Sequence, residues 1–235
     1  MESGRHLRPT DARAAFVFDL DGTLVDTVET RIVAWLRTFD EYRIQASRAQ
    51  VAKLIGSDGR RVARVVAEGA GESIDSERAE EIDRRAGDIY SELNTDPQVL
   101  PGAIELLNVL DGHGLLWAVA TSSRREQVGA SINALGLSRN PVIVDGSQVK
   151  RAKPAPDLLL MAALELGVEP SRSWYVGDAI WDMQAANAAG MRAIGVVSGS
   201  ATAEELAEAG ASFTIKGLNE LIPFVRAEAR MGDEH

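Results

Sequence analysis

The sequence predicts an α/β protein: a mostly parallel β-sheet with helices on both faces, and an all-helical insert after the first strand. Three observations lead to this prediction. Short apolar runs alternate with helical patterns along most of the chain, which is typical of a parallel sheet. These runs are continuously apolar, as expected for strands that helices cover on both faces. One stretch, residues 27–96, contains helical patterns only.

Six apolar runs have the length and composition of buried strands. They are Ala14–Phe18, Leu115–Ala120, Val142–Val144, Trp174–Val176, Ala193–Val197 and Phe213–Ile215. Two of the helices between them have recognisable ends. One is expected to begin at Pro101 and to stop near Gly112 and Gly114. Another is expected over residues 157–166, with Gly167 ending it.

Residues 27–96, called the helical insert from here on, break the alternation. Two apolar series each fall on one face of a helix. They are Val28, Ile32, Trp35, Leu36 and Phe39, and then Ala79, Ile82, Ala86, Ile89, Tyr90 and Leu93. Shorter helices are expected over residues 47–54 and 60–68. We therefore predict two domains, a core of residues 12–26 and 97–235 and the helical insert, with hinges near residues 26–27 and 96–101. Flexible tails are expected at residues 1–11 and 231–235.

Composition excludes several classes of protein. The 235 residues contain no cysteine and three histidines, so disulfides, thiolate chemistry and histidine-rich metal sites are not expected. The formal net charge of −10 argues against a general nucleic-acid binder. No apolar run is long enough to span a membrane, and the first residues lack the apolar stretch of a signal peptide. We therefore expect a cytoplasmic protein; the sequence does not indicate its oligomeric state.

Two aspartates end the first predicted strand, in the run Asp19-Leu20-Asp21-Gly22-Thr23. Ligands bind beyond the carboxyl ends of strands in open parallel sheets, so these acids lie where chemistry is expected. Residues two apart in extended chain point to the same side. Gly22 permits the sharp turn that follows. A solvated Asp-Gly turn is the alternative interpretation.

A second acidic pair follows the strand predicted at residues 174–176. Asp178 lies at the strand end, and Asp182 lies one helical turn further on. Acidic residues also suit the first turn of a helix, so a purely structural role is the alternative. Four carboxylates that converge without a cation repel one another. A hard divalent ion with oxygen ligands resolves the conflict, and Mg²⁺ is the expected one.

Two further segments supply groups that suit a phosphate. Thr121-Ser122-Ser123 offers hydroxyls and free amides ahead of a helix, although simple helix capping accounts for it equally well. Lys153 lies in the run Lys153-Pro154-Ala155-Pro156-Asp157, in which the prolines restrict the backbone. A solvated surface lysine is the alternative there.

In order along the chain, these four motifs resemble those of the haloacid dehalogenase-like hydrolase superfamily, in its branch of phosphatases with a helical cap. The stretch Asn187-Ala188-Ala189-Gly190-Met191 is also typical of that branch, and the resemblance extends over about residues 16–224. It implies a Rossmann-like core and identifies the helical insert as the cap. The insert is similar to those of phosphoglycolate phosphatases and β-phosphoglucomutases, although the second motif reads Thr121-Ser122 where the former often have Thr-Asn.

The resemblance also implies roles for the acidic residues. Asp19 would be the nucleophile that attacks a phosphate monoester and forms an aspartyl-phosphate. Asp21 would act first as general acid and then as general base. Mg²⁺ would be held by the carboxylates of Asp19 and Asp178 and by the backbone carbonyl of Asp21, with Asp182 in support.

The remaining motifs would bind the substrate. The resemblance implies that Thr121, a backbone amide near Ser122 and Lys153 hold the phosphoryl oxygens. A loop of the cap selects the substrate in similar enzymes. Arginines near that loop in this chain, or across from it, are candidates for contacts with an anionic group, with solvated helix residues as the alternative. They are Arg60, Arg61 and Arg124.

The expected function is therefore Mg²⁺-dependent hydrolysis of a small phosphorylated metabolite. A sugar-phosphate mutase is the main alternative, because such enzymes use the same aspartyl-phosphate. Haloacid dehalogenases resemble the pattern but lack an acid at the position of Asp21. Receiver domains, which accept a phosphoryl group without catalysing hydrolysis, lack both that acid and a helical insert.

Overall fold

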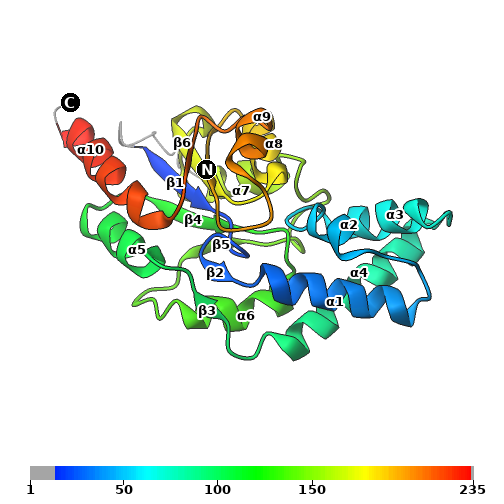
Figure 1. The fold of residues 1–235 in the computed structure, drawn as a ribbon. Coiled ribbons are helices and arrows are strands. Elements are labelled where there is room, and N and C mark those ends of the chain that lie inside the picture. The colour runs from blue at the N-terminus through cyan, green and yellow to red at the C-terminus, as the bar shows by residue number, and fades with distance from the viewer. Residues whose placement is uncertain (1–13, 234–235) are drawn as a thin grey trace, which may run out of the picture.

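The computed structural model describes residues 14–233 (Figure 1). The tail expected over residues 1–11 lies outside the described residues, as do residues 234–235. The last helix, α10 (Leu221–Asp233), extends into the tail expected over residues 231–235, and the flexibility of that tail stays a prediction. The apolar side of α10, with Leu221 and Val225 fully buried, packs on the core beside helix α5 (Ala103–Gly112), and this packing supports the helix.

Six parallel strands form the main sheet and confirm the predicted fold class. In chain order they are β1 (Ala15–Phe18), β4 (Trp117–Ala120), β5 (Val142–Val144), β6 (Ser173–Gly177), β7 (Arg192–Val196) and β8 (Phe213–Ile215). Their order across the sheet is β5-β4-β1-β6-β7-β8, with every neighbouring pair parallel. Each predicted run became one strand, with ends that differ by at most two residues. Strand β1 lies inside the sheet, so its carboxyl end has neighbours on both sides.

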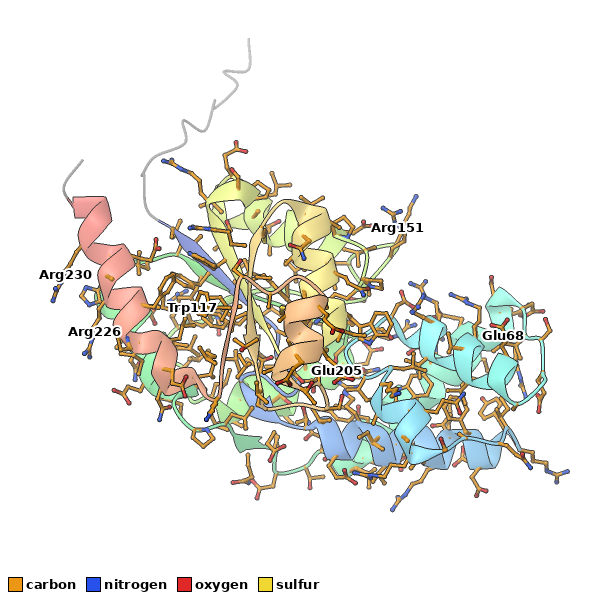
Figure 2. The ribbon with its side chains drawn as sticks, turned by 45° about the horizontal axis from the view of Figure 1, so that its top comes forward. Glu68, Trp117, Arg151, Glu205, Arg226 and Arg230 are labelled. Atoms are coloured by element: carbon orange, nitrogen blue, oxygen red, sulfur yellow. The ribbon has the colours of Figure 1, made fainter. Side chains whose placement is uncertain are left out.

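Helices cover both faces of this sheet because alternate side chains of each strand point to opposite faces. Phe16 and Phe18 join a core with α5, α6 (Arg125–Ala134) and α10 on one face. Val17 joins a second core, with α7 (Asp157–Leu166), α8 (Ile180–Ala189) and α9 (Ala203–Glu208), on the other. Figure 2 shows Trp117 inside the molecule, whereas Arg151 and Arg226 point outward. Two short 3-10 helices lie at Pro170–Arg172 and Leu218–Glu220. Among residues 14–233, no helix is both long and apolar enough to cross a membrane.

The helical insert extends to one side of the sheet (Figure 1) and has a separate hydrophobic cluster, which Ala179 and Trp181 of the core join. Its helices are α1 (Val28–Glu41), α2 (Arg48–Ala52), α3 (Gly59–Gly69) and α4 (Ser76–Leu93). A two-stranded antiparallel ribbon joins it to the sheet: β2 (Val25–Asp26) pairs with β3 (Gln98–Val99). The sequence analysis did not predict this ribbon, because strands of two residues carry no readable periodicity. The ribbon lies where the hinges are expected, and their role as hinges stays a prediction.

Candidate active site

The carboxyl ends of three neighbouring strands bring the predicted motifs together. Phe18 of β1 pairs with Val119 of β4 and with Val176 of β6, so the segments that follow these strands leave the sheet at one level. Asp19 extends β1 with a backbone hydrogen bond to the Val176 carbonyl (2.8 Å). Thr121, next to β4, likewise bonds the Val144 carbonyl of β5 (3.0 Å). The motifs are distant in sequence and adjacent at this edge of the sheet.

Three buried carboxylates and one buried lysine form the centre of the site. One oxygen from each of Asp19, Asp178 and Asp182 lies within 4.8 Å of the others, and the three residues are at most 3% exposed. The ammonium of Lys153, fully buried, donates to Asp19 Oδ1 and to Asp182 Oδ1, each at 2.7 Å. Asp178 accepts a hydrogen bond from the Thr23 hydroxyl at 2.9 Å. Three carboxyl groups thus lie close together, and one ammonium pairs with two of them.

The electrostatics of this centre favour a further positive charge. Burial raises the pKa of Asp19 to about 7, although Lys153 opposes the shift. Burial, and then the nearby Asp182 and Asp19, raise the pKa of Asp178 well above its ordinary value. Burial disfavours the charged form of Lys153, but Asp182 and Asp19 outweigh it and raise the pKa, so the lysine stays protonated. A cation bound here would relieve the cost of ionising Asp178 and Asp19.

The space around Asp178 also suits a bound ion. A Cβ atom on Gly199 would lie 1.8 Å from Asp178 Oδ2, and one on Gly22 would lie 2.4 Å from it. Gly22 also has a φ of +81°, which other residues resist. Two backbone segments without side chains therefore approach the carboxylate closely. Together with the oxygen-only donor set, this arrangement fits a hard divalent cation such as Mg²⁺.

Asp21 does not join this acidic centre but faces the helical insert. It accepts hydrogen bonds from Thr27 (2.6 Å) and Tyr90 (2.9 Å) at Oδ1, and from Ser123 (2.6 Å) and Arg31 (3.0 Å) at Oδ2. Burial raises the pKa of Asp21, but the charge of Arg31 and these hydrogen bonds outweigh it and lower the pKa to about 2. The carboxylate is therefore ionised and fully partnered.

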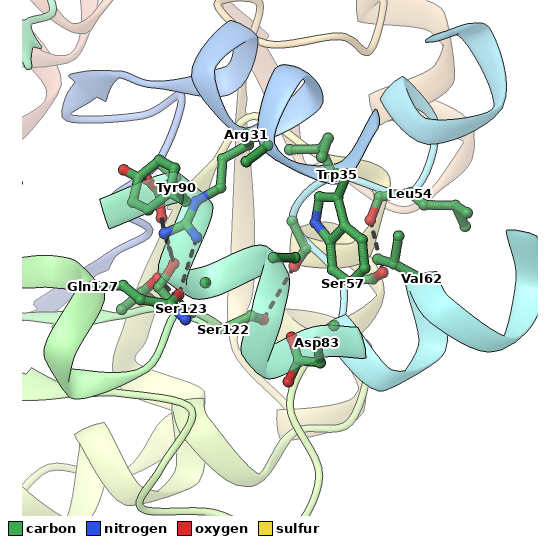
Figure 3. A pocket seen from close by; sticks show the side chains of 18 of the residues that line it. Arg31, Trp35, Leu54, Ser57, Val62, Asp83, Tyr90, Ser122, Ser123 and Gln127 are labelled. Carbon is green, nitrogen blue, oxygen red and sulfur yellow. Dashed lines mark hydrogen bonds and ion pairs between the residues drawn. The ribbon is translucent and has the colours of Figure 1, made fainter. Parts of the chain in front are cut away.

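A small cavity of about 50 Å³ lies between the strand ends and the helical insert (Figure 3). Asp19, Asp21 and the candidate phosphate-binding residues line its core side. The latter are Thr121, Ser122 and Lys153. The helical insert closes the other side with Trp35 and Val62, among other residues. The Ser122 hydroxyl donates across the junction to the Gly56 carbonyl of the insert at 3.1 Å.

The three arginines that the sequence analysis singled out make other contacts. Arg60 pairs with Asp58 (2.6 Å), and the Arg61 guanidinium lies 4.8 Å from the centre of the Trp181 ring. Arg124 pairs with Asp83 (2.6 Å) and with Glu80 (2.8 Å) of α4, although Asp83 itself lines the cavity. These three arginines are not among the residues that line the cavity.

The cavity does contain an arginine and a tyrosine that the sequence analysis did not assign to the site, Arg31 and Tyr90. A signal for Arg31 was available: it lies on the same face of α1 as Val28, Ile32 and Trp35, so a cation interrupts an apolar face. Tyr90 belongs to one of the predicted apolar faces, and nothing in the sequence indicates that its hydroxyl contacts Asp21.

Comparisons with known proteins agree with this fold and identify a family. Residues 16–196 match the family described as haloacid dehalogenase-like hydrolase. Phosphoglycolate phosphatase 1 of Pseudomonas aeruginosa is 30% identical over 88% of this chain and 78% of its own length. Fructose-1-phosphate phosphatase YqaB of Escherichia coli is 32% identical over 78% of this chain and 96% of its own length. The chain also matches SUPPRESSOR OF QUENCHING 1 of Arabidopsis thaliana at 32% identity, but spans only 18% of that longer protein.

Solved structures show the same architecture. A hydrolase from Pseudomonas syringae superposes with a TM-score of 0.87 at 33% identity, over 92% of this chain and 99% of that one. A β-phosphoglucomutase from Clostridium difficile has a TM-score of 0.80 at 23% identity, over 95% and 100% of the two chains, which shows a shared fold. The fold and the relatives thus define a hydrolase of the phosphatase class. The chain belongs to the haloacid dehalogenase-like hydrolase family.

Proposed function

We propose that this protein is a Mg²⁺-dependent phosphatase that hydrolyses a small phosphorylated metabolite through an aspartyl-phosphate. The observation that carries the proposal is the convergence of Asp19, Lys153, Asp178 and Asp182 at one end of the sheet, beside a cavity that the helical insert partly covers. A nucleophilic carboxylate attacks an anionic phosphate only where positive charge offsets the repulsion. Lys153 supplies part of that charge, and the acidic centre can hold a cation that supplies the rest.

The reaction takes place in two displacements. An Asp19 carboxylate oxygen bonds to phosphorus while the bond from phosphorus to the ester oxygen breaks, and Asp21, which must be in its protonated form for this step, gives that leaving oxygen its proton. Water then attacks the phosphorus of the aspartyl-phosphate and passes a proton to Asp21. Inorganic phosphate leaves, and the carboxylate of Asp19 is restored.

The surrounding residues bind and orient the reacting groups. Asp19 and Asp178 would hold Mg²⁺, with the backbone carbonyl of Asp21 and with Asp182 in support. The ion supplies Lewis-acid stabilisation of the phosphoryl charge when bound. Thr121, Lys153 and an amide near Ser122 would bind the phosphoryl oxygens, and positioning of this kind supplies most of the rate enhancement in phosphoryl transfer.

The helical insert would act as a cap. The cavity of about 50 Å³ has room for a few water molecules only, since one water needs about 10–15 Å³. A phosphorylated metabolite needs more room than this, so we expect the insert to move away for entry and to close again to exclude water. Arg60, Arg61 and Arg124 stay candidates for substrate contacts only in a conformation in which their present ion pairs and ring contacts have opened.

Product analysis tests the proposed function. Purified protein is incubated with Mg²⁺ and a panel of phosphate monoesters: phosphoglycolate, fructose 1-phosphate, other sugar phosphates and p-nitrophenyl phosphate. We expect release of inorganic phosphate in stoichiometric amounts with the alcohol product. Conversion of a sugar phosphate to an isomer without phosphate release would instead identify a sugar-phosphate mutase.

Metal removal gives the first quantitative prediction. Dialysis against EDTA should lower turnover at least about 10³-fold, because the buried acidic centre then repels an anionic substrate and loses its Lewis acid. Added Mg²⁺ should restore activity and raise the melting temperature, since an ion that binds only the folded state stabilises it. Full activity in EDTA-treated, metal-free protein would contradict the proposed cofactor.

A second prediction concerns the space beside Asp178. Gly199→Ala places a methyl group 1.8 Å from Asp178 Oδ2 and must displace the carboxylate or the backbone. We expect the Mg²⁺ concentration at half-saturation to rise at least about tenfold, as measured by activity titration and by thermal shift. Gly129→Ala is the matched control, because a Cβ there meets no atom within 4 Å. Equal Mg²⁺ titration curves for the two variants would show that Asp178 does not bind the ion.

A further inference from the structure

The helical insert forms the side of the cavity toward which a leaving group would point. Asp19, the proposed nucleophile, lies on the core side with Thr121 and Lys153. The attacking and leaving oxygens of a phosphoryl transfer lie roughly in line, on opposite sides of the phosphorus. The alcohol part of the substrate therefore faces away from the core and contacts the insert.

Four large apolar side chains lie on this face of the insert (Figure 3). They are Trp35, Leu54, Ile55 and Val62, and each is at most 6% exposed. The ring of Phe39 stacks on Trp35 with a centroid distance of 5.4 Å, which fixes the orientation of the indole. Such a surface suits the carbon skeleton of an alcohol and does not compensate a buried charge.

The insert, all of which the structure describes, contributes two charged side chains to the cavity, Arg31 and Asp83. Arg31 is already paired: it contacts Asp21 at 3.0 Å and donates to Gln127 Oε1 at 3.0 Å. Gln127 can approach because a glycine faces it. A Cβ on Gly87 would lie 1.9 Å from Gln127 Nε2.

Asp83 is paired as well. It contacts Arg124 at 2.6 Å, and Arg124 also contacts Glu80 at 2.8 Å. A carboxylate or a second phosphate on the leaving group would therefore find no free cation on this face of the insert, and it would lie near the Asp83 carboxylate. Burial of an unpaired charge in such a place is costly.

The indole N–H of Trp35 is a donor without an acceptor. It makes no hydrogen bond within residues 14–233, although buried indole N–H groups usually do (Figure 3). The two hydroxyls on the same face are engaged, since Ser57 donates to the Leu54 carbonyl and Tyr90 donates to Asp21. Trp35 can therefore donate to a hydroxyl or carbonyl oxygen of the leaving group.

We infer that the substrate is the phosphate ester of an uncharged, hydroxylated alcohol, such as a polyol or a sugar, and that Trp35 determines this specificity by donating to it. This inference rests on the proposed function and narrows it. Phosphoglycolate, which carries a carboxylate, is then a poor substrate, whereas fructose 1-phosphate belongs to the favoured class.

Pairs of esters that differ in one charged group test the substrate class. Glycerol 3-phosphate and 3-phosphoglycerate differ in a terminal CH₂OH or carboxylate, and glucitol 6-phosphate and 6-phosphogluconate form a longer pair of the same kind. We expect kcat/KM of the wild type to be at least about tenfold higher for the uncharged member of each pair. The difference should persist in about 1 M KCl, where a screening length of about 3 Å removes long-range repulsion by the net charge of −10.

A variant of Trp35 tests the proposed donor. Trp35→Phe keeps an aromatic ring and loses the N–H. We expect kcat/KM to fall about fivefold on glycerol 3-phosphate, the effect of one hydrogen bond, and less than about twofold on propyl phosphate, whose leaving group has no hydroxyl beyond the ester oxygen.

Trp174→Phe is the matched control. Trp174 Nε1 is also buried without a partner, but Trp174 packs against Phe213 and Phe224 and does not line the cavity. The ratio of kcat/KM between glycerol 3-phosphate and propyl phosphate should therefore stay at its wild-type value. Thermal melts establish that both variants are folded.

Other outcomes would overturn the inference. Equal or faster turnover of the anionic member of a pair, or phosphate release confined to esters with a second anionic group, would refute the substrate class. Equal losses of Trp35→Phe on glycerol 3-phosphate and propyl phosphate would refute the role of the indole N–H. In these cases the wild type still releases phosphate, so the proposed function stands. If wild-type protein with Mg²⁺ releases no phosphate from any ester, the proposed function itself fails.

Discussion

Asp19→Asn is expected to lower turnover at least about 10³-fold while the protein stays folded, because an amide cannot form the proposed aspartyl-phosphate. The structure gives a reason why the fold should tolerate this change. Asp19 is buried within an acidic centre, and burial raises its pKa to about 7. A neutral amide removes one charge from a crowded site, and Lys153 keeps its ion pair with Asp182. The melting temperature in the absence of metal should therefore be unchanged or higher.

The measurement combines kinetics with detection of the intermediate. Turnover is measured for both proteins, and acid-quenched samples are digested and searched by mass spectrometry for a phosphorylated peptide that contains residue 19. Asp40→Asn, an exposed change on α1, is the matched control and should retain full activity. Substantial turnover by folded Asp19→Asn protein would refute the assignment of the nucleophile.

Lys153→Met is expected to have the largest effect on stability as well as on catalysis. The ammonium is the direct partner of both Asp19 and Asp182, and all three side chains are at most 2% exposed. Removal of one partner from a buried ion pair leaves uncompensated charge and typically costs about 3–5 kcal/mol. The same change removes a cation that would neutralise the phosphoryl group, which should lower turnover at least about 10²-fold.

Urea denaturation and activity assays measure the two effects. Lys150→Met, at an exposed position in the same segment, is the control and should change the free energy of unfolding by less than about 0.5 kcal/mol. High Mg²⁺ should recover part of the stability of Lys153→Met, because the ion neutralises the same carboxylates. A variant as stable and as active as wild type would show that Lys153 holds neither the acidic centre nor the phosphate.

The main sheet was predictable because its strands are buried on both faces, and such strands are continuously apolar in sequence. All six predicted runs became strands, and the helix expected over residues 157–166 has those bounds. The β2–β3 ribbon was not predictable, since Val25 and Gln98 belong to strands of two residues that exist only because distant segments pair.

The candidate site likewise has a part that was predictable from sequence and a part that was not. Asp19, Asp178 and Lys153 stand next to strand ends or in a restricted loop, so sequence alone indicated their position. The structure gathers them into one buried cluster, and Asp19 and Lys153 also line the cavity. Residues of the insert carry no such marker. The sequence analysis selected Arg60 and Arg61 because they flank a glycine-rich loop, whereas the structure lines the cavity with Arg31 and Tyr90 instead.

The sequence by itself determined the sheet, the position of the helical insert and the acidic motifs, because burial on both strand faces and the residues at strand ends leave local patterns. Only the tertiary structure decided how the insert meets the core. Whether Arg31 contacts Asp21 or solvent depends on the packing of α1 against α4 and on the space that Gly87 leaves for Gln127. Contacts of this kind join residues far apart in the chain, and no local pattern encodes them.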